Sequence, residues 1–563
     1  MFGPGATGRV DAGSWALVAA CVALLAWKAR AIWTINVNWD EFYFLTHVHA
    51  LLRGDLQLPF QTTYAQAFRW LPWVGGEMAQ MHAARFCMFL LLVLSVWQLV
   101  RLASRWSSPG AALTAALAFL CLLATETHGA SFRADSMLLP ILLGVLLLLT
   151  RPVASRRTDM LVGVLCGIGV AVSVKLALFA PLFLACLLLA GDGTVPVAAR
   201  LRAALPRCLV MGAVTLGVAA VLVGLHHLTL RAPDLVSATS FADRSLGKAI
   251  LEMPFLPGRF YLYRLVRADR FIWIMLAVGL LLALARRRWL PAAMVLALSP
   301  LLFYRNAFPY FYVEMLAPAA VLVALVVDEV RALARRGAGA SSREWVPVAC
   351  GLLLLVQGGS RLPLMSSDEQ SGQRRVLDVV HQIFPRPVAY LDHAGMVAGF
   401  HKVNFFMSTW GVEEYQRRGA PFMAPALRAY RPQLLLINRD YLDVRTPYSN
   451  VLMPEDRDAL QRFYLPYWGP IHVAGARAAL AAGDTRVLAL PFPGKYRLES
   501  AGPVRIDGIV RSPGEVFDVA GESVQLAREA DTVAGAPEVR LLTAEARPPP
   551  AEPPEIRYIF KGL

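Results

Sequence analysis

Residues 14–42 read SWALVAACVALLAWKARAIWTINVNWDEF. The first part of this stretch, residues 14–34, is mostly apolar. Its length of about 20 residues is what an α-helix needs to cross a hydrocarbon core roughly 30 Å thick. The motif Trp39-Asp40-Glu41-Phe42 follows directly. Because ionisable groups at membrane depth are costly, two carboxylates at the end of such a span indicate a functional site.

The composition of the whole chain is typical of a polytopic membrane protein. Hydrophobic residues make up 56% of its 563 residues and charged residues 17%, and its mean hydropathy is +0.49. Such values exclude most soluble proteins. Basic residues outnumber acidic ones by 55 to 40. This excess does not indicate nucleic-acid binding, because arginines gather in five short tracts between apolar stretches. The tracts contain Arg101 and Arg105; Arg151, Arg156 and Arg157; Arg200, Arg202 and Arg207; Arg286, Arg287 and Arg288; and Arg331, Arg335, Arg336 and Arg343.

Eleven apolar stretches are predicted to be transmembrane helices. They lie near residues 14–34, 83–103, 109–127, 136–150, 159–173, 177–190, 208–230, 271–285, 290–304, 313–332 and 345–361. With the N-terminus inside, this order places all five arginine tracts in the cytoplasm, as the positive-inside rule requires. We expect an uncleaved first helix, exported loops at 35–82 and 231–270, an exported turn at 128–135, and an exported C-terminus.

The region after residue 362 has the composition of a soluble domain. Residues 386–391 and 432–437 are predicted as buried strands, and 373–384 as an amphipathic helix, which favours an α/β domain over 363–490. Short alternating runs with turns at Ile506-Asp507-Gly508 and Ser512-Pro513-Gly514 predict a β-sandwich-like tail over 491–563. All seven cysteines precede residue 351, so no disulfide and no C-x-x-C zinc pattern is expected in this region.

Asp40 and Glu41 are the candidate catalytic residues. In a loop or strand, adjacent carboxylates point to different sides, so one would act as general base on an acceptor hydroxyl and the other would position the substrate. The alternative is a helix N-cap or a solvated loop start. Binding of a metal ion by Asp40 with His47 and His49 is disfavoured, because no second cluster accompanies them.

Several other polar groups lie in or between apolar stretches, at points predicted to reach the same exported face of the membrane as Asp40 and Glu41. Arg133 and Asp135 lie in a short turn, and Lys175 lies inside an apolar hairpin, where a lone charge is costly. The candidates for binding a donor phosphate or its lipid are Arg133, Lys175, Arg259, Arg305, Tyr310 and Tyr312. The candidates for positioning the sugar or acceptor are His128, Asp135, Tyr304 and Glu314. The structural alternatives are an internal Arg133–Asp135 salt bridge and a Lys175 side chain that snorkels to the interface.

These residue types together predict one chemistry. A sugar on a polyprenyl monophosphate leaves behind an anion, so its transfer needs cations for the departing charge and a base for the incoming hydroxyl. This combination favours an inverting single displacement without a cofactor. A divalent cation held by Asp40, Glu41 and Asp135 remains the alternative.

Over roughly residues 10–340, the chain resembles the integral-membrane glycosyltransferases of the GT-C type, in the protein O-mannosyltransferase and aminoarabinose transferase branch. The resemblance rests on Trp39-Asp40-Glu41-Phe42, on the run from Arg133 to Leu139, on Gly167-Ile168-Gly169 before Lys175, and on Pro309-Tyr310 before Leu316-Ala317-Pro318. It implies a polyprenyl-phosphate sugar donor, a base at Asp40 or Glu41, and donor phosphate binding by the lysine and arginine positions.

The resemblance also implies catalysis on the non-cytoplasmic face, here the periplasmic side of a bacterial inner membrane. The acceptor is left open as a glycan, lipid or protein, because the region after 362 does not look like the sugar-binding domain of eukaryotic protein mannosyltransferases. Two other classes of protein are considered. They are a transporter or flippase of lipid-linked sugars, and a non-catalytic scaffold for assembly of cell-envelope glycans.

Overall fold

A computed structural model describes residues 12–151, 153, 155–190, 195–231, 255–337, 342–361, 367–528, 538–550 and 559–560. The chain forms two compact units. The helical unit comprises residues 1–35, 50–74 and 79–368, and the C-terminal unit comprises residues 36–49, 75–78 and 369–563. The segment that contains Asp40 and Glu41 thus belongs to the C-terminal unit, although it follows the first predicted span.

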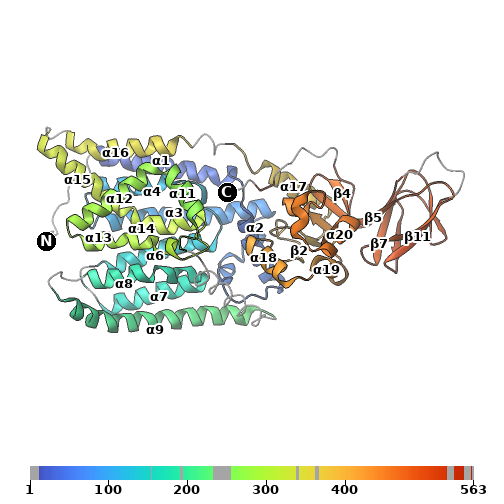
Figure 1. Ribbon diagram of the computed structural model, residues 1–563, viewed down its shortest axis with the longest axis horizontal. Helices are drawn as coiled ribbons and strands as arrows, with labels where there is room; N and C mark the ends of the chain where they lie inside the picture. Colours follow the sequence, from blue (N-terminus) through green and yellow to red (C-terminus); the bar gives the residue numbers. More distant parts are fainter. Residues whose placement is uncertain are drawn as a thin grey trace. The chain divides into compact units, whose positions relative to one another are not determined.

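The described part of the helical unit consists of α-helices and short 3-10 helices, without strands (Figure 1). In chain order they are α1 (Ala12–Thr34), the last turn of α2 (Trp39–Arg53), η1 (Thr63–Phe68), η2 (Leu71–Trp73), α3 (Glu77–Ala103), α4 (Pro109–Leu120), α5 (Leu123–His128), α6 (Ala134–Leu149), α7 (Arg156–Val172), η3 (Val174–Phe179), α8 (Ala180–Leu189), α9 (Val197–Thr229), α11 (Arg259–Ala268), α12 (Arg270–Ala285), α13 (Trp289–Ala293), η5 (Met294–Leu302), η6 (Pro309–Phe311), α14 (Tyr312–Ala319), α15 (Val321–Gly337) and α16 (Ser342–Gly359).

Each of the eleven predicted apolar stretches is helical in the structure. Length and apolar composition qualify three of the described helices, α1, α3 and α9, as candidate membrane spans. Two bent pairs, α11 with α12 and η6–α14 with α15, raise the number to five if each pair counts as one span. The remaining apolar helices are shorter, so eleven crossings remain a prediction. Of the predicted exported loop at 231–270, residues 232–254 lie outside the described part.

Local sequence explains where several helices begin. Ser108 precedes Pro109, and its hydroxyl accepts a hydrogen bond from the Ala111 backbone N–H at 3.4 Å, which caps α4. Ser155 caps α7 in the same way through the Thr158 N–H at 3.2 Å. These caps satisfy N–H groups that have no partner within the helix.

Small residues set the distance between α7 and α9. Gly163 and Gly167 are four residues apart and therefore lie on one face of α7. A Cβ at Gly163 would lie 2.7 Å from Val214, and one at Gly167 would lie 2.6 Å from Val218. The Thr215 hydroxyl also donates to the Gly163 carbonyl at 3.2 Å. The two backbones pack closely because neither glycine has a side chain.

The C-terminal unit contains an α/β half followed by a strand-rich half. Its elements after residue 369 are α17 (Ser371–Ile383), β1 (Ala389–Leu391), β2 (His401–Lys402), α18 (Thr409–Arg418), α19 (Met423–Tyr430), β3 (Leu434–Leu436), η8 (Asp440–Leu442), η9 (Pro447–Val451), α20 (Pro454–Phe463), β4 (Tyr464–Trp468), β5 (Ile471–Ala479), β6 (Thr485–Ala489), β7 (Gly494–Glu499), β8 (Val504–Ile506), β9 (Ile509–Arg511), β10 (Val516–Val519), β11 (Ser523–Ala527) and β12 (Glu538–Thr543). The predicted helix at 373–384 and the two predicted strands are confirmed by α17, β1 and β3.

One eight-stranded sheet runs through both halves, in the order β10-β7-β12-β5-β3-β1-β2 with β4 also paired to β5. β1 is parallel to β2 and β3, whereas β5 is antiparallel to β3, β4 and β12. The first part of β5 pairs in the α/β half and its last part pairs with β12. The sheet therefore continues across the predicted boundary at 490/491.

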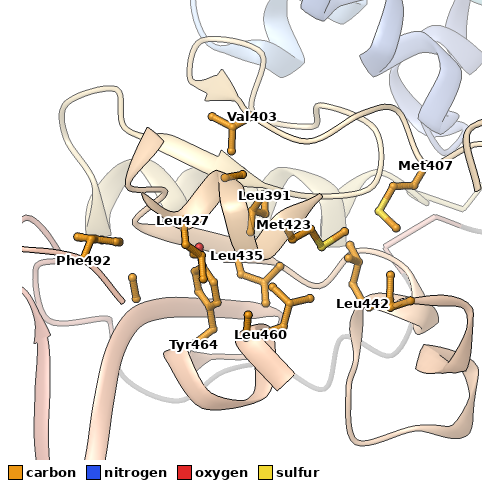
Figure 2. Close-up of a cluster of buried hydrophobic side chains, with 14 of the residues drawn as sticks. Leu391, Val403, Met407, Met423, Leu427, Leu435, Leu442, Leu460, Tyr464 and Phe492 are labelled. Atoms are coloured by element: carbon orange, nitrogen blue, oxygen red, sulfur yellow. The ribbon is translucent and has the colours of Figure 1, made fainter. Parts of the chain in front are cut away.

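Each half has its own hydrophobic core. In the α/β half, Leu391 and Leu435 from β1 and β3 meet Met423 and Leu427 of α19 and Leu460 of α20, as Figure 2 shows. In the other half, β6-β11-β8-β9 form a second sheet, whose buried residues pack with those of β5, β7, β10 and β12. The predicted turn at Asp507-Gly508 joins β8 to β9, and both residues have positive φ (48° and 82°), as a tight hairpin requires.

Candidate active site

Three predicted site residues meet at the start of α6 in the helical unit. Arg133 is the residue before the helix, and Asp135 lies in its first turn, where the helix dipole favours a negative charge. The Asp135 carboxylate lies 2.8 Å from the Lys175 Nζ on η3 and 3.7 Å from the Arg133 guanidinium. All three side chains are at most 15% exposed. Lys175 is thus a paired charge rather than a lone one.

Aromatic rings of η6 cover the two cations. The Tyr310 ring centroid lies 3.4 Å from the Arg133 guanidinium carbon and 5.0 Å from the Lys175 Nζ. Phe311 lies 5.4 Å from the same Nζ. Rings in these positions attract cations through their quadrupoles and exclude water from them. His128, at the end of α5, contacts Tyr310 at 6.3 Å between ring centroids.

Glu314 completes the buried charges of this site. It lies in the first turn of α14, is 1% exposed, and interacts electrostatically with Asp135, Lys175 and Arg133. In the described part of the chain, its Oε2 and the Tyr312 hydroxyl have no hydrogen-bond partner. Buried polar atoms normally have one, so the Glu314 oxygen that lacks a partner beside Asp135, Lys175 and Arg133 is consistent with a polar ligand in the cluster.

The other predicted positions differ in their relation to this cluster. Tyr304 is buried and packs on Phe311 at 5.7 Å between ring centroids. Arg305 is half-buried after η5. Arg259 is exposed at the start of α11, and no ion pair joins it to the cluster within the described ranges. The structure therefore brings together His128, Arg133, Asp135, Lys175, Tyr304, Tyr310 and Glu314, whereas no side-chain hydrogen bond, ion pair or ring contact in the described part of the chain joins Tyr312 or Arg259 to them.

Asp40 and Glu41 lie in the first turn of a helix, α2, and not in the loop or strand that we expected. The Asn38 side chain accepts a hydrogen bond from the Asp40 N–H at 2.9 Å, and the Glu41 carboxylate accepts one from the Asn38 N–H at 3.0 Å. This reciprocal arrangement is a capping box. Glu41 is 1% exposed and serves the cap, whereas the Asp40 carboxylate is half-exposed.

A second buried charge network was missed by the sequence analysis. Arg361 lies 2.8 Å from both Glu126 and Asp269, and Lys28 donates to the Thr125 carbonyl at 2.9 Å. The sequence contains a sign of this network, because Lys28 and Glu126 are charged residues within apolar stretches, as Lys175 is. Lys28 and Glu126 also line a cavity of about 30 Å³, which has room for a water molecule but not for a sugar.

No group of three or more histidine, cysteine, aspartate or glutamate side chains lies close enough to hold a metal ion within the residues that the structure describes. His47 packs its ring against Tyr43, with 4.3 Å between centroids. The alternative of a metal ion at Asp40, His47 and His49 therefore gains no support from their arrangement.

Comparisons with known proteins identify the fold. Residues 67–222 match the family described as dolichyl-phosphate-mannose-protein mannosyltransferase. A crystal structure of ArnT from Cupriavidus metallidurans bound to undecaprenyl phosphate matches with a TM-score of 0.52 at 16% identity, over 77% of this chain and 95% of that one.

An oligosaccharyltransferase from Archaeoglobus fulgidus, crystallised in complex with zinc and sulfate, matches with a TM-score of 0.50 at 13% identity. The match covers 80% of this chain and 72% of that one. No curated protein sequence matches. The resemblance to GT-C type glycosyltransferases is thereby confirmed, and the chain has their helical membrane fold with a strand-rich C-terminal region.

Proposed function

We propose that the protein transfers a sugar from a polyprenyl-phosphate donor to an acceptor hydroxyl at the exported face of the membrane. The observation that carries this proposal is the buried cluster in which Arg133 and Lys175 lie beneath Tyr310, next to Asp135 and Glu314. Two cations shielded from water stabilise a departing phosphate much more strongly than solvated cations do.

The members of the cluster have different tasks in this reaction. Arg133 and Lys175 bind the donor phosphate, and Asp135 holds the Lys175 ammonium in place at 2.8 Å. Tyr310 and Tyr312 border this phosphate site, and Arg305 and Arg259 bind the donor lipid nearer the exported surface. His128, Tyr304, Asp135 and the unpaired Glu314 oxygen supply hydrogen-bond partners to sugar or acceptor hydroxyls.

Asp40 is the proposed base for the acceptor hydroxyl. The capping box already uses the buried Glu41 carboxylate, whereas the Asp40 side chain is half-exposed and can therefore be reached by an acceptor hydroxyl. Attack by the activated hydroxyl on the anomeric carbon expels the polyprenyl phosphate in one displacement, which inverts the configuration at that carbon. The proton of the hydroxyl passes to Asp40.

Two comparisons support the donor class and the membrane location. ArnT, which has the same fold, was crystallised with undecaprenyl phosphate, and the matched family is described by its dolichyl-phosphate-mannose donor. The arginine tracts support a bacterial inner-membrane protein whose C-terminal unit lies in the periplasm. The acceptor in this proposal is a glycan, lipid or protein hydroxyl, without further specification.

The test is turnover of a panel of polyprenyl-phosphate sugars by the full-length protein in lipid nanodiscs, with membrane extract as acceptor. Wild type is expected to release polyprenyl phosphate and Asp40→Asn to release none. Glu41→Gln is the matched control. It is expected to keep activity, because glutamine also serves at this position of a capping box. Donor translocation in liposomes without release would instead indicate a transporter, and equal activity of Asp40→Asn would overturn the assignment of the base.

A further inference from the structure

Residues 36–49 contain Asp40 and belong to the same compact unit as residues 369–563. We call residues 36–49 the Asp40 segment. Its contacts with the C-terminal residues are hydrogen bonds between side chains and backbone groups, at the start of the segment and at Thr46, and ring contacts along the first turns of α2.

Gln373 holds the start of the Asp40 segment. Its side-chain Oε1 accepts from the Val37 N–H at 2.9 Å, and its Nε2 donates to the Val37 carbonyl at 2.7 Å. The amide thus pairs with one backbone residue as a neighbouring β-strand would. Gln373 is 1% exposed, so removing its amide leaves two buried backbone groups without partners. The adjacent Asn36 side chain donates to the carbonyls of Glu369 and Ile559 at 3.3 and 3.2 Å.

Trp39 begins the face of α2 that contacts the C-terminal residues. Its ring lies edge-on to His393 and to Phe560, at 5.7 and 6.1 Å between centroids. The Arg439 guanidinium lies 4.7 Å from the same ring. His393 and Arg439 follow closely after β1 and β3, so the carboxyl ends of these parallel strands meet the indole.

The same face continues one and two turns further along α2. The Tyr43 ring stacks on Phe406 at 4.1 Å and 16°, and the Thr46 hydroxyl donates to the Gly395 carbonyl at 3.0 Å. Positions 39, 43 and 46 are spaced by four and three residues, which places them on one side of a helix. Asp40 follows Trp39 and is thus fixed to a backbone that the C-terminal residues hold at several points.

The geometry points to Gln373 as a positioning residue for Asp40, with the Tyr43–Phe406 stack as a second support. The C-terminal unit is then part of the catalytic apparatus, because it orients the base, and does more than select an acceptor. This inference rests on the proposed function of Asp40. Its physical basis is that displacing a catalytic group by about 1 Å lowers a rate by roughly 100-fold.

The first test compares Gln373→Met with Gln433→Met in the full-length protein in nanodiscs. Methionine has nearly the size of glutamine but none of its hydrogen bonds. Gln433 accepts from the Thr543 hydroxyl at 3.0 Å and is not among the partners of the Asp40 segment named above, so it provides a matched control in the same unit. We expect kcat to fall about 10- to 100-fold in Gln373→Met with the donor KM within two-fold of wild type. Gln433→Met is expected to match wild type.

The second test uses the variant Gln373→Glu. A protonated carboxyl has one donor and one acceptor, like the amide, whereas a carboxylate has no donor for the Val37 carbonyl. The kcat of Gln373→Glu relative to wild type should therefore rise several-fold between pH 8 and pH 6. The same ratio for Gln373→Met should stay flat, because methionine does not titrate. Protonation of a buried carboxyl also restores global stability, so thermal unfolding of Gln373→Glu is measured at both pH values, and the positioning role requires kcat to rise at a temperature where the variant is fully folded at pH 8 as well as at pH 6.

Hydrogen–deuterium exchange separates failure of this inference from failure of the proposed function. Peptides from residues 36–49 should exchange faster in Gln373→Met and in Phe406→Leu, but not in Gln433→Met. Faster exchange with unchanged kcat in both variants would overturn the positioning role, and so would unchanged exchange. If wild type shows no turnover with any donor, the proposed function fails, whereas the exchange result still decides whether Gln373 holds the segment.

Discussion

Lys175 and Asp135 form a 2.8 Å ion pair among apolar helices. Such a pair costs desolvation energy and adds little net stability, which makes a purely structural explanation weak. Its value is that it holds an ammonium group in one place beside Arg133 and Tyr310 before any ligand arrives. A phosphate would then meet a fixed cation and not a mobile side chain.

We predict that Lys175→Gln weakens binding of undecaprenyl phosphate by about 10- to 100-fold, because a hydrogen bond to a charged group contributes roughly 1.5–3 kcal/mol. The measurement is the dissociation constant in nanodiscs. Arg207→Gln is the control, since Arg207 pairs with Asp159 at 2.8 Å at the opposite end of α7. Equal affinity of Lys175→Gln and wild type would remove Lys175 from the phosphate site.

A second prediction concerns His381, whose pKa is raised by its hydrogen bond to Glu77 at 2.9 Å. A raised pKa in the folded state means that the protonated form stabilises the protein. This stability is fully present below the unfolded pKa of about 6.5 and is lost as the pH rises through the folded value. His381 is 42% exposed, so solvent screening limits the contribution to about 0.5 kcal/mol.

The expected result is that His381→Gln lowers the melting temperature at pH 6 and changes it less at pH 9. The measurement is thermal unfolding of the full-length protein at both pH values. The pH dependence should disappear in a Glu77→Gln background, because the partner charge is then absent. A larger effect of His381→Gln at pH 9 than at pH 6 would contradict the assigned pair.

At the scale of secondary-structure elements, α9 depends on close contact with α7. Only 6% of the 18 most apolar consecutive residues of α9 are buried. The face of α7 that contains Gly163 and Gly167 supplies a close-packed contact for this helix. We predict that Gly167→Val forces the helices apart and destabilises the protein by about 1–3 kcal/mol, because a Cβ there lies 2.6 Å from Val218. Gly217→Val on α9 is the control, since no atom lies within 4 Å of its added Cβ. Equal melting temperatures of the two variants in detergent would show that the contact is unimportant.

Local sequence patterns predicted the elements well. The apolar stretches are helices, residues 373–384 form α17, and Asp507-Gly508 makes the hairpin turn, because periodicity and turn chemistry act over a few residues. Asn38 followed three residues later by Glu41 is a sequence pattern typical of a capping box, although we expected the two carboxylates in a loop or strand. The candidates around Asp135 were found because charges stand out in apolar sequence.

Long-range partners were not predictable. Gln373 and Val37 are 336 residues apart, and no periodicity indicates that they meet. Likewise, β5 pairs with strands on both sides of residue 490, whereas the composition changes near that position. Such pairings depend on how whole sheets and segments pack, and the sequence of one element does not encode its distant neighbour in a readable form.

At the scale of the whole molecule, the arginine tracts predict the orientation in the membrane. We expect a membrane-impermeant maleimide to label Ser512→Cys in intact cells and to label Arg157→Cys only after permeabilisation, both in a background without the seven native cysteines. Ser512 lies in the turn after β9 and Arg157 in the first turn of α7. Labelling of Arg157→Cys in intact cells would contradict the orientation and, with it, the periplasmic location of the proposed reaction.

The contacts between residues 36–49 and residues 369–563 have a consequence for biosynthesis. Roughly 320 residues separate the end of this segment from the chain that holds it. At about 5–20 residues per second, a ribosome needs roughly 15–60 s to synthesise them. Asp40 therefore leaves the ribosome long before Gln373 exists, and the proposed base is not held in position until that part of the chain has been made. A product of premature termination before α17 is then expected to lack this support, with kcat lowered by at least the roughly 10- to 100-fold expected for Gln373→Met.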